Sequence, residues 1–329
     1  MGSTHIPRRK VLAAGAALAA APFGASAQAM PLIAYLEPIS GTSPTNKINL
    51  AAFRQGLAEH GFVEGKNFTF ASWYAEGDID RLPELAKEVV ARNPAVILAS
   101  TPNAARPLKA LTKTIPVVFA QAADAVDNGE VTNPKRPEAN LTGIANFNEL
   151  NPKRLSWLVE AAPKAQVLGY IADANLGSFD RNYRQAAQAA DEMKRKLIVG
   201  KAATDAEIEA ALKMMGAAGV QALLVGPIRG AYPRPGAIVK LTSQLPVPVM
   251  YYDRAFVDVG GLMSFGAAFK EIYRLAGTYV GRILKGEKVA DLPVLQPGSY
   301  ELVVNAAAAK AQGLVFSQKV LGAASEVIG

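Results

Sequence analysis

Residues 100–103, Ser-Thr-Pro-Asn, have the side chains and the position best suited to bind a small polar group. They follow the apolar run 95–99, which is short and partly β-branched, as is typical of a buried strand. The capping residues and the proline predict that a helix begins here. A helix start has unpaired backbone N–H groups and a partial positive charge. Hydroxyl and amide side chains beside it therefore predict hydrogen bonds to an acidic group of a ligand.

The sequence contains no known motif for catalysis or for nucleotide binding. The sequence contains no G-x-G-x-x-G or Gly-x4-Gly-Lys-Ser/Thr phosphate loop and no G-x-S-x-G nucleophile elbow. It has no cysteine and only two histidines, which excludes a thiolate nucleophile and cysteine-ligated metal. The polar cluster 251–254 has no histidine or cysteine base beside it, and we interpret it as a strand end lining a cleft. We therefore expect a protein that is not an enzyme and that uses no cofactor or metal.

The elements that position residues 100–103 belong to a longer α/β pattern. The helix is expected to extend to about Thr114, and residues 115–120 form the next strand. A loosely similar order of strand, helix and strand recurs later, at 220–227, about 235–244 and 247–253. The two orders together predict two similar α/β lobes, each with a loop at the carboxyl end of a strand. Two such loops facing each other across a cleft would form a ligand site.

Strands and helices are expected to alternate along the rest of the chain, which is the pattern of a parallel sheet. The other expected strands are 32–36, 67–74, 141–145, 167–172, 197–199, 262–266 and 300–305. One other helix is expected to end near residue 59. The remaining expected helices span about 81–92, 153–162, 179–196, 206–216 and 268–285.

Length and composition indicate a globular protein with one large core or two ordinary ones. The chain has 329 residues, of which half are hydrophobic and 19% are charged. Its net charge is +7, but three of its 35 basic residues lie in the acid-free segment 1–29, which leaves 32 bases and 28 acids in the remainder. That modest, dispersed charge is not the clustered basic face of a nucleic-acid-binding protein.

Residues 1–29 have the pattern of an export signal, so the mature chain is expected to begin at Met30. Arg8, Arg9 and Lys10 precede an alanine-rich apolar run that is too short to span a bilayer. Residues 27–29, Ala-Gln-Ala, have the small-x-small form of a cleavage site. The paired arginines resemble a twin-arginine signal, and an ordinary secretory signal is the alternative. No later segment has 18 consecutive apolar residues, which predicts a soluble periplasmic protein.

Several longer segments resemble one known protein family. They are AAFRQGLAEHGFVEGKNF (51–68), YAEGDIDRLPELA (74–86), TIPVVFAQAADAV (114–126), VDVGGLMSFG (257–266) and YVGRILKGEKVADLPVLQPGSYELVVNAAAAKAQGL (279–314). Together they resemble the ABC-transporter substrate-binding proteins typified by tryptophan- and tyrosine-binding proteins. The resemblance spans nearly all of the mature chain, and it does not specify the ligand.

The resemblance implies a type I periplasmic-binding fold, with two Rossmann-like lobes joined by three crossings. Residues 30–147 plus 263–300 would form one lobe and 148–262 plus 301–329 the other, with crossings near Phe147, Gly261 and Val303. The lobes would open and close about these crossings. Where the family tends to have Gly-Thr-Pro-Ala and Asp-Pro-Val, this chain has Ser-Thr-Pro-Asn at 100–103 and Asp-Ala-Val at 124–126. The second difference removes a rigid turn residue beside the expected pocket.

The strand-end loops of the two lobes then supply the candidate ligand site. Expected polar partners from the first lobe are Ser40, Thr42, Ser100, Thr101, Asn103 and Asp124. Those from the second lobe are Asp173, Asn175, Ser178 and Asp253, where an aspartate suits an ammonium group. Aromatic candidates for the wall are Tyr35, Phe119, Tyr252 and Phe265. The alternative for each polar residue is a plain helix cap, and for each aromatic it is core packing.

We therefore expect a monomeric periplasmic solute-binding protein of an ABC importer. Its ligand would be a small carboxylate, for example an amino acid or an aromatic acid, delivered to an inner-membrane permease and its ATPase. The alternative is a secreted enzyme on a doubly wound α/β fold. A ligand-sensing regulator with the same two lobes is disfavoured, because an export signal stands where its helix-turn-helix would be.

Overall fold

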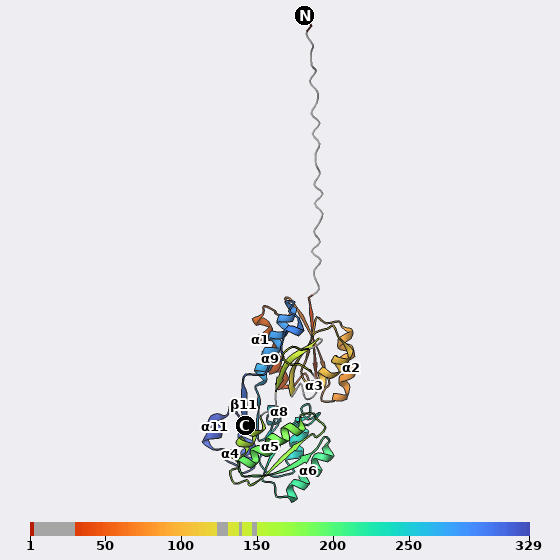
Figure 1. The fold of residues 1–329 in the computed structure, drawn as a ribbon. Coiled ribbons are helices and arrows are strands. Elements are labelled where there is room, and N and C mark those ends of the chain that lie inside the picture. Colours follow the sequence, from red (N-terminus) through yellow and green to blue (C-terminus); the bar gives the residue numbers. More distant parts are fainter. Residues whose placement is uncertain (3–29, 124–130, 138–139, 147–149) are drawn as a thin grey trace. The chain divides into compact units, whose positions relative to one another are not determined.

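The computed structural model describes residues 1–2, 30–123, 131–137, 140–146 and 150–329 (Figure 1). Residues 31–329 form one compact unit, separate from residues 1–30. The expected export signal, Asp124 and the crossing near Phe147 lie outside the described residues. Among the described residues, no helix combines the length and the apolar character needed to cross a membrane.

Lobe 1 is built on a five-stranded parallel sheet with strand order β2-β1-β3-β4-β5. Its strands are β1 (Leu32–Glu37), β2 (Thr69–Tyr74), β3 (Val96–Ala99), β4 (Val117–Ala123) and β5 (Leu141–Asn146). Its helices are α1 (Pro44–Glu59), α2 (Leu82–Ala91), α3 (Pro102–Leu111) and α9 (Phe269–Leu284), with short 3-10 turns at Ile79–Arg81 and Val289–Asp291. Helices α2 and α3 share one apolar core with the sheet, and α1 and α9 share another.

Lobe 2 is built on a seven-stranded sheet with strand order β12-β11-β10-β9-β8-β6-β7. Its strands are β6 (Val167–Ala172), β7 (Lys196–Lys201), β8 (Ala222–Val225), β9 (Val249–Tyr251), β10 (Met263–Ala267), β11 (Tyr300–Asn305) and β12 (Glu326–Ile328). Only β10 and β11 pair antiparallel among these strands. Its helices are α4 (Asn151–Ala161), α5 (Phe179–Glu192), α6 (Asp205–Ala217), α7 (Pro235–Thr242), α8 (Arg254–Asp258), α10 (Ala306–Ala311) and α11 (Gln318–Ala323).

The central strands are apolar throughout because helices cover both faces of each sheet. Every residue of β3 and of β8 is buried, as expected for a strand of a parallel sheet with two covered faces. Successive residues of β1 enter different cores: Ile33 contributes to the core with α1 and α9, and Ala34 to the core with α2 and α3. The two-lobed α/β fold predicted from the sequence is therefore confirmed.

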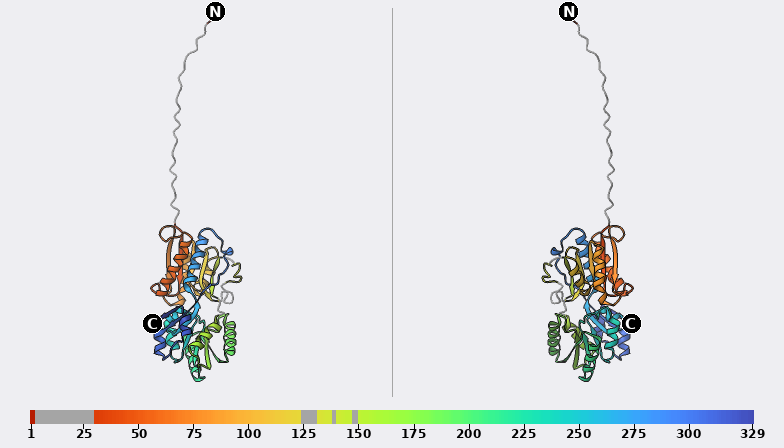
Figure 2. Two further views of the ribbon diagram at one scale, coloured as in Figure 1. Left: turned by 90° about the vertical axis from the view of Figure 1, so that its left-hand side faces the viewer. Right: turned by 90° about the vertical axis from the view of Figure 1, so that its right-hand side faces the viewer.

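The chain passes between the lobes at places other than those expected. Residues 263–267 were expected in lobe 1, but β10 pairs with β9 and β11 in the sheet of lobe 2. Helix α9, which follows at once, packs on α1 in lobe 1 (Figures 1 and 2). Gly261 and Val303 therefore lie inside lobe 2, and they are not crossings. The turn at Gly261 ends α8, since its N–H donates to the carbonyl of Phe256 (2.8 Å).

The described crossings lie near Ala268 and between Leu295 and Tyr300. Leu295 still belongs to lobe 1, where its N–H donates to the carbonyl of Gly143 (3.0 Å). Tyr300 begins β11 and pairs with Ala267 in lobe 2. Among the described residues, any hinge between the lobes is thus expected at these two segments.

Glycines hold α9 against α1 at van der Waals distance. A Cβ atom built at Gly277 of α9 would lie 2.1 Å from the carbonyl oxygen of Phe53, and one at Gly56 of α1 would lie 2.0 Å from that of Arg274. No side chain fits at either position. This contact attaches the segment between the two crossings to lobe 1.

Candidate functional site

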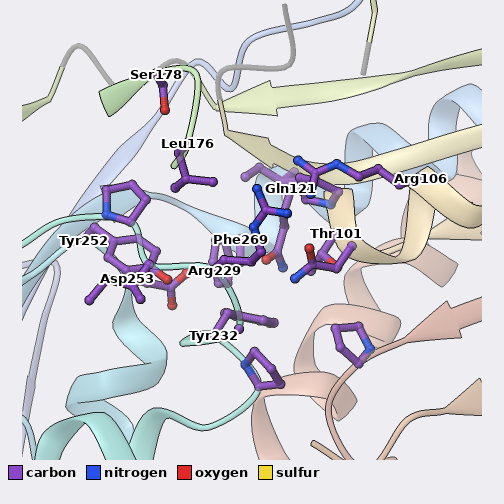
Figure 3. A pocket seen from close by; sticks show the side chains of 18 residues that line it. Thr101, Arg106, Gln121, Leu176, Ser178, Arg229, Tyr232, Tyr252, Asp253 and Phe269 are labelled. Atoms are coloured by element: carbon purple, nitrogen blue, oxygen red, sulfur yellow. The ribbon is translucent and has the colours of Figure 1, made fainter. Parts of the chain in front are cut away.

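A cavity of about 130 Å³ lies where the strand-end loops of the two lobes meet (Figure 3). Lobe 1 contributes the loop after β1, the first turns of α3 and α9, and the end of β4. Lobe 2 contributes the loops after β6, β8 and β9. The polar lining residues are Thr101, Asn103, Arg106, Gln121, Ser178, Arg229 and Asp253. The apolar and aromatic ones are Pro38, Pro102, Leu176, Pro227, Ile228, Tyr232, Pro233, Tyr252, Phe269 and Ile272.

The structure brings five of the expected site residues together around this cavity. These five are Thr101, Asn103, Ser178, Tyr252 and Asp253. Each follows or ends a parallel strand, and the carboxyl ends of parallel strands meet at one edge of a sheet. A cavity of this kind, largely apolar with a few convergent polar groups, is the usual form of a small-molecule site.

Other expected residues lie away from the cavity. The hydroxyls of Ser40 and Thr42 bond each other at 3.0 Å in an exposed loop. The carboxylate of Asp173 accepts from the backbone N–H of Asn175 (2.8 Å), which fixes a turn and leaves Asn175 exposed. The ring of Phe265 stacks on Tyr300 at 6.1 Å between centroids.

Three more candidates are buried in the core of lobe 1. Ser100 is fully buried beside Glu37 instead of facing the cavity. Tyr35 and Phe119 are also fully buried and pack in the two apolar cores of the lobe. Strand alternation explains this placement, because neighbouring residues at a strand end point to opposite faces.

The first turn of α3 offers one backbone donor to the cavity. Thr101 is the N-cap, and its Oγ1 accepts from the N–H of Ala104 at 3.4 Å. Pro102 has no N–H to donate. The N–H of Asn103 has no hydrogen bond to a described residue. Thr101 is thus a weak cap and a cavity residue at once, and Asn103 provides both a backbone N–H and a side-chain amide.

Asp253 lies on the lobe 2 side and, of the residues that the structure describes, is the only acidic one that lines the cavity. Its Oδ1 accepts from the N–H of Ala255 (2.8 Å), so it also caps α8. Burial raises the pKa of this carboxyl to about 7, although the bond from Ala255 and the charge of Arg154 oppose the rise. The carboxyl is therefore poised between its neutral and charged forms near neutral pH.

The buried side chain of Arg154 in α4 supports this end of the site from behind. Its Nε donates to the carbonyl of Phe265 (2.8 Å), its Nη1 to Oδ1 of Asn151 (3.0 Å) and its Nη2 to the carbonyl of Tyr252 (3.3 Å). These bonds fix the strand end from which Tyr252 and Asp253 reach the cavity.

Four lining residues were not expected from the sequence: Arg106, Gln121, Arg229 and Tyr232. Arg106 lies one helical turn after Asn103, so helical spacing could have found it. Arg229 follows β8, to which the strand-end rule applies equally. Tyr232 gave no local signal, because its placement depends on the contact between lobes described below.

A second carboxyl, Glu37, is fully buried at the end of β1 behind the cavity wall. The hydroxyl of Tyr35 donates to it, and so does the N–H of Ile39 (3.2 Å). Burial raises the pKa of Glu37 to about 7. No group of three or more metal-ligating side chains was found in the described part of the chain.

Two α/β lobes with a small cavity between their strand-end loops define a ligand-binding protein of the type I periplasmic-binding class. The family model for "ABC transporter substrate binding protein" matches residues 33–328. The chain belongs to this family, which confirms the resemblance found in the sequence. Members bind small molecules and work with an ABC permease.

The individual proteins that this chain resembles share less than 25% of its sequence. A tyrosine-binding protein of Clostridioides difficile is 24% identical over 262 residues, which are 77% of this chain and 73% of the relative. An ABC domain from Streptococcus pneumonia, solved in complex with L-Trp, superposes with a TM-score of 0.78 at 23% identity, covering 91% of this chain and all of the other. A ligand-free, open substrate-binding protein from Clostridium difficile gives a TM-score of 0.68 at 21% identity over 91% of this chain and 99% of the other. These solved structures support the fold.

Proposed function

We propose that this protein binds an amino acid with an apolar or aromatic side chain and delivers it to an ABC permease and its ATPase. The observation on which this rests is the pairing of opposite groups across one small cavity. Asn103 and Thr101 present donors on one side, and Asp253 presents a carboxyl on the other. This arrangement suits a ligand that has a carboxylate at one end and an ammonium group nearby.

The remaining lining residues define the body of the ligand. Leu176, Tyr252 and Phe269 form part of an apolar wall, which suits a hydrocarbon or aromatic side chain better than the many hydroxyls of a sugar. Arg229, from the loop after β8, adds a positive charge to the described lining, which favours a ligand with a carboxylate. The names of the relatives, which bind tyrosine and L-Trp, support the same class.

An aromatic acid without an ammonium group is the second candidate. The raised pKa of Asp253 favours it, because a neutral carboxyl can donate a hydrogen bond to an acid without repelling it. A thermal-shift screen of the mature chain against amino acids and their deaminated acids separates the two. Stabilisation by an amino acid alone supports the first ligand class, and the absence of any shift would contradict both.

Replacing Thr101 with Ala tests whether the start of α3 contacts the ligand. A lost contact to a carboxylate is expected to weaken binding about tenfold. The loss of its long cap bond costs about 1 kcal/mol or less of folding stability. The measurement is calorimetric titration together with the melting temperature.

The matched control is Thr204→Ala, which removes the N-cap of α6, a residue that does not line the cavity. It should lower the melting temperature and leave affinity unchanged. If Thr101→Ala behaves in the same way as this control, Thr101 is only a cap.

We also propose that the protein is exported and matures near Met30. The support is the sequence of residues 1–29. Protein isolated from the periplasm of the native host should have Met30 as its first residue, and finding Met1 or Gly2 there would contradict export with cleavage. Replacing Arg8 and Arg9 with Lys should block export by a twin-arginine route, and normal export would favour the general secretory route.

A further inference from the structure

Tyr232 belongs to lobe 2 by connectivity but packs on lobe 1. It lies in the loop between β8 and α7, yet its ring meets Phe269 of α9 edge to face at 6.3 Å and joins the core of α1 and α9. Other residues of this loop also lie close to lobe 1. A Cβ atom built at Gly230 would lie 3.2 Å from Cδ1 of Ile79, and one at Gly77 would lie 3.6 Å from the carbonyl oxygen of Pro233. This loop is therefore a main contact of lobe 2 with lobe 1.

The hydroxyl of Tyr232 is buried and has no hydrogen-bond partner in the described structure. Tyr232 also lines the cavity, beside Arg229 from the same loop (Figure 3). A buried hydroxyl without a partner destabilises the folded state, so such groups usually meet a water or a ligand. Burial and the nearby carboxyl of Glu37 raise its pKa well above the ordinary value. The phenol therefore stays protonated and is a hydrogen-bond donor.

The polar groups around this hydroxyl are engaged with one another. The Tyr35 hydroxyl donates to Glu37, and Oδ1 of Asn46 lies 2.9 Å from the same hydroxyl. The side chain of Gln121, which lines the cavity, lies beside the Tyr232 hydroxyl and opposes the rise in its pKa. The two groups do not meet the geometry of a hydrogen bond, however. The amide nitrogen of Gln121 lies instead 3.3 Å from the hydroxyl of Tyr273. An acceptor atom of a molecule in the cavity would complete the hydrogen bond that the Tyr232 hydroxyl does not make with Gln121.

We propose that Tyr232 couples ligand binding to lobe closure. Its hydroxyl donates a hydrogen bond to the carboxylate of the bound ligand, and its ring holds lobe 2 against Phe269 of lobe 1. The proposal rests on the proposed function for the identity of the ligand. Lobe 2 would thus contact the ligand's carboxylate through Tyr232, and lobe 1 would contact it through Thr101 and Asn103. Only a closed protein would make all of these contacts.

The test uses the mature chain with L-tryptophan and L-tyrosine as probes. Tyr232→Phe should weaken binding of both about tenfold, because a charge-assisted hydrogen bond is lost. It should leave the melting temperature of the ligand-free protein unchanged or raised, because the hydroxyl has no partner to lose. Binding of tryptamine, which has no carboxylate, should be the same in both proteins. Tyr183→Phe, on the exposed face of α5, is the matched control and should change nothing.

Tyr232→Leu removes the ring as well. It should weaken binding further and abolish the decrease in radius of gyration that we expect L-tryptophan to cause in the wild type. Wild-type affinity in Tyr232→Phe would overturn the proposal, and so would a melting temperature lowered by several degrees without ligand, since the hydroxyl would then have a structural partner. If the wild type binds neither probe, the proposed ligand class fails, and the ligand-free melting temperatures still decide whether the hydroxyl is unpaired.

Discussion

Asp253→Asn is expected to weaken binding of L-tryptophan about 100-fold or more without unfolding the protein. Asn is as good an N-cap as Asp, so the bond to the N–H of Ala255 and the start of α8 should survive. The charge that would meet the ammonium group of the proposed ligand is lost. Leaving one partner of a buried charge pair without the other costs about 2–5 kcal/mol in comparable complexes. Calorimetric titration gives the affinity, and circular dichroism checks the fold.

The same residue predicts how affinity depends on pH. Burial raises the pKa of Asp253 to about 7, with Asp258 and Glu301 adding to the rise and Arg154 opposing it. An ammonium group binds the charged carboxylate, so below pH 7 the protein must first lose a proton. Affinity should therefore fall as the pH drops through 7, by up to about tenfold per pH unit. Above pH 7 it should level off.

Asp253→Asn is also the control for this profile, because it should bind weakly at every pH with no inflection near 7. A wild-type affinity that is constant between pH 5 and 8 would contradict an ammonium contact at Asp253. Tighter binding of the deaminated acid at low pH would instead assign the ligand to the second candidate class.

Gly277→Val is expected to give the largest loss of stability. A Cβ atom at this position would lie 2.1 Å from the carbonyl oxygen of Phe53, which belongs to the backbone of α1 and has no freedom to move aside. The two helices must separate and expose part of the core that they share with the sheet. Overpacking of this kind costs about 3 kcal/mol or more, which corresponds to a fall of roughly 5 °C or more in Tm for a chain of this size.

Gly322→Val in α11 is the matched control, because no atom lies within 4 Å of a Cβ built there. It should melt close to the wild-type temperature. Equal melting temperatures for Gly277→Val and the wild type would mean that α9 does not pack on α1 in solution, which would contradict the attachment of this segment to lobe 1.

The fold could be predicted from the sequence where local patterns determine it. The run 95–99 became β3 and the helix start after it became α3, because a buried parallel strand is apolar throughout and Thr-Pro is a strong helix signal. The lobe boundary at 263 could not be predicted in the same way. The pairing of β10 with β9 and β11 joins residues far apart in sequence, and no local pattern encodes it.

In the candidate site too, the residues that local patterns determine could be predicted, and those that long-range contacts place could not. Thr101, Asn103 and Asp253 were predictable because they directly follow strands whose carboxyl ends meet. Ser100 and Phe265 were not distinguished from them, because one residue along a strand reverses the face to which a side chain points. Tyr232 was not predictable, because only the contact between the lobes brings it to the cavity.

The central claim is that the cavity between the lobes recognises the carboxylate of a small molecule. Calorimetric titration of the mature wild-type chain with L-tryptophan and tryptamine, and with L-tyrosine and tyramine, tests it most directly. Each pair differs only in the carboxylate. We predict saturable binding of one amino acid per chain and binding of its amine at least about 100-fold weaker, because the donors of Thr101, Asn103 and Tyr232 would be left unpaired. An amine that binds as tightly as its amino acid would contradict the account.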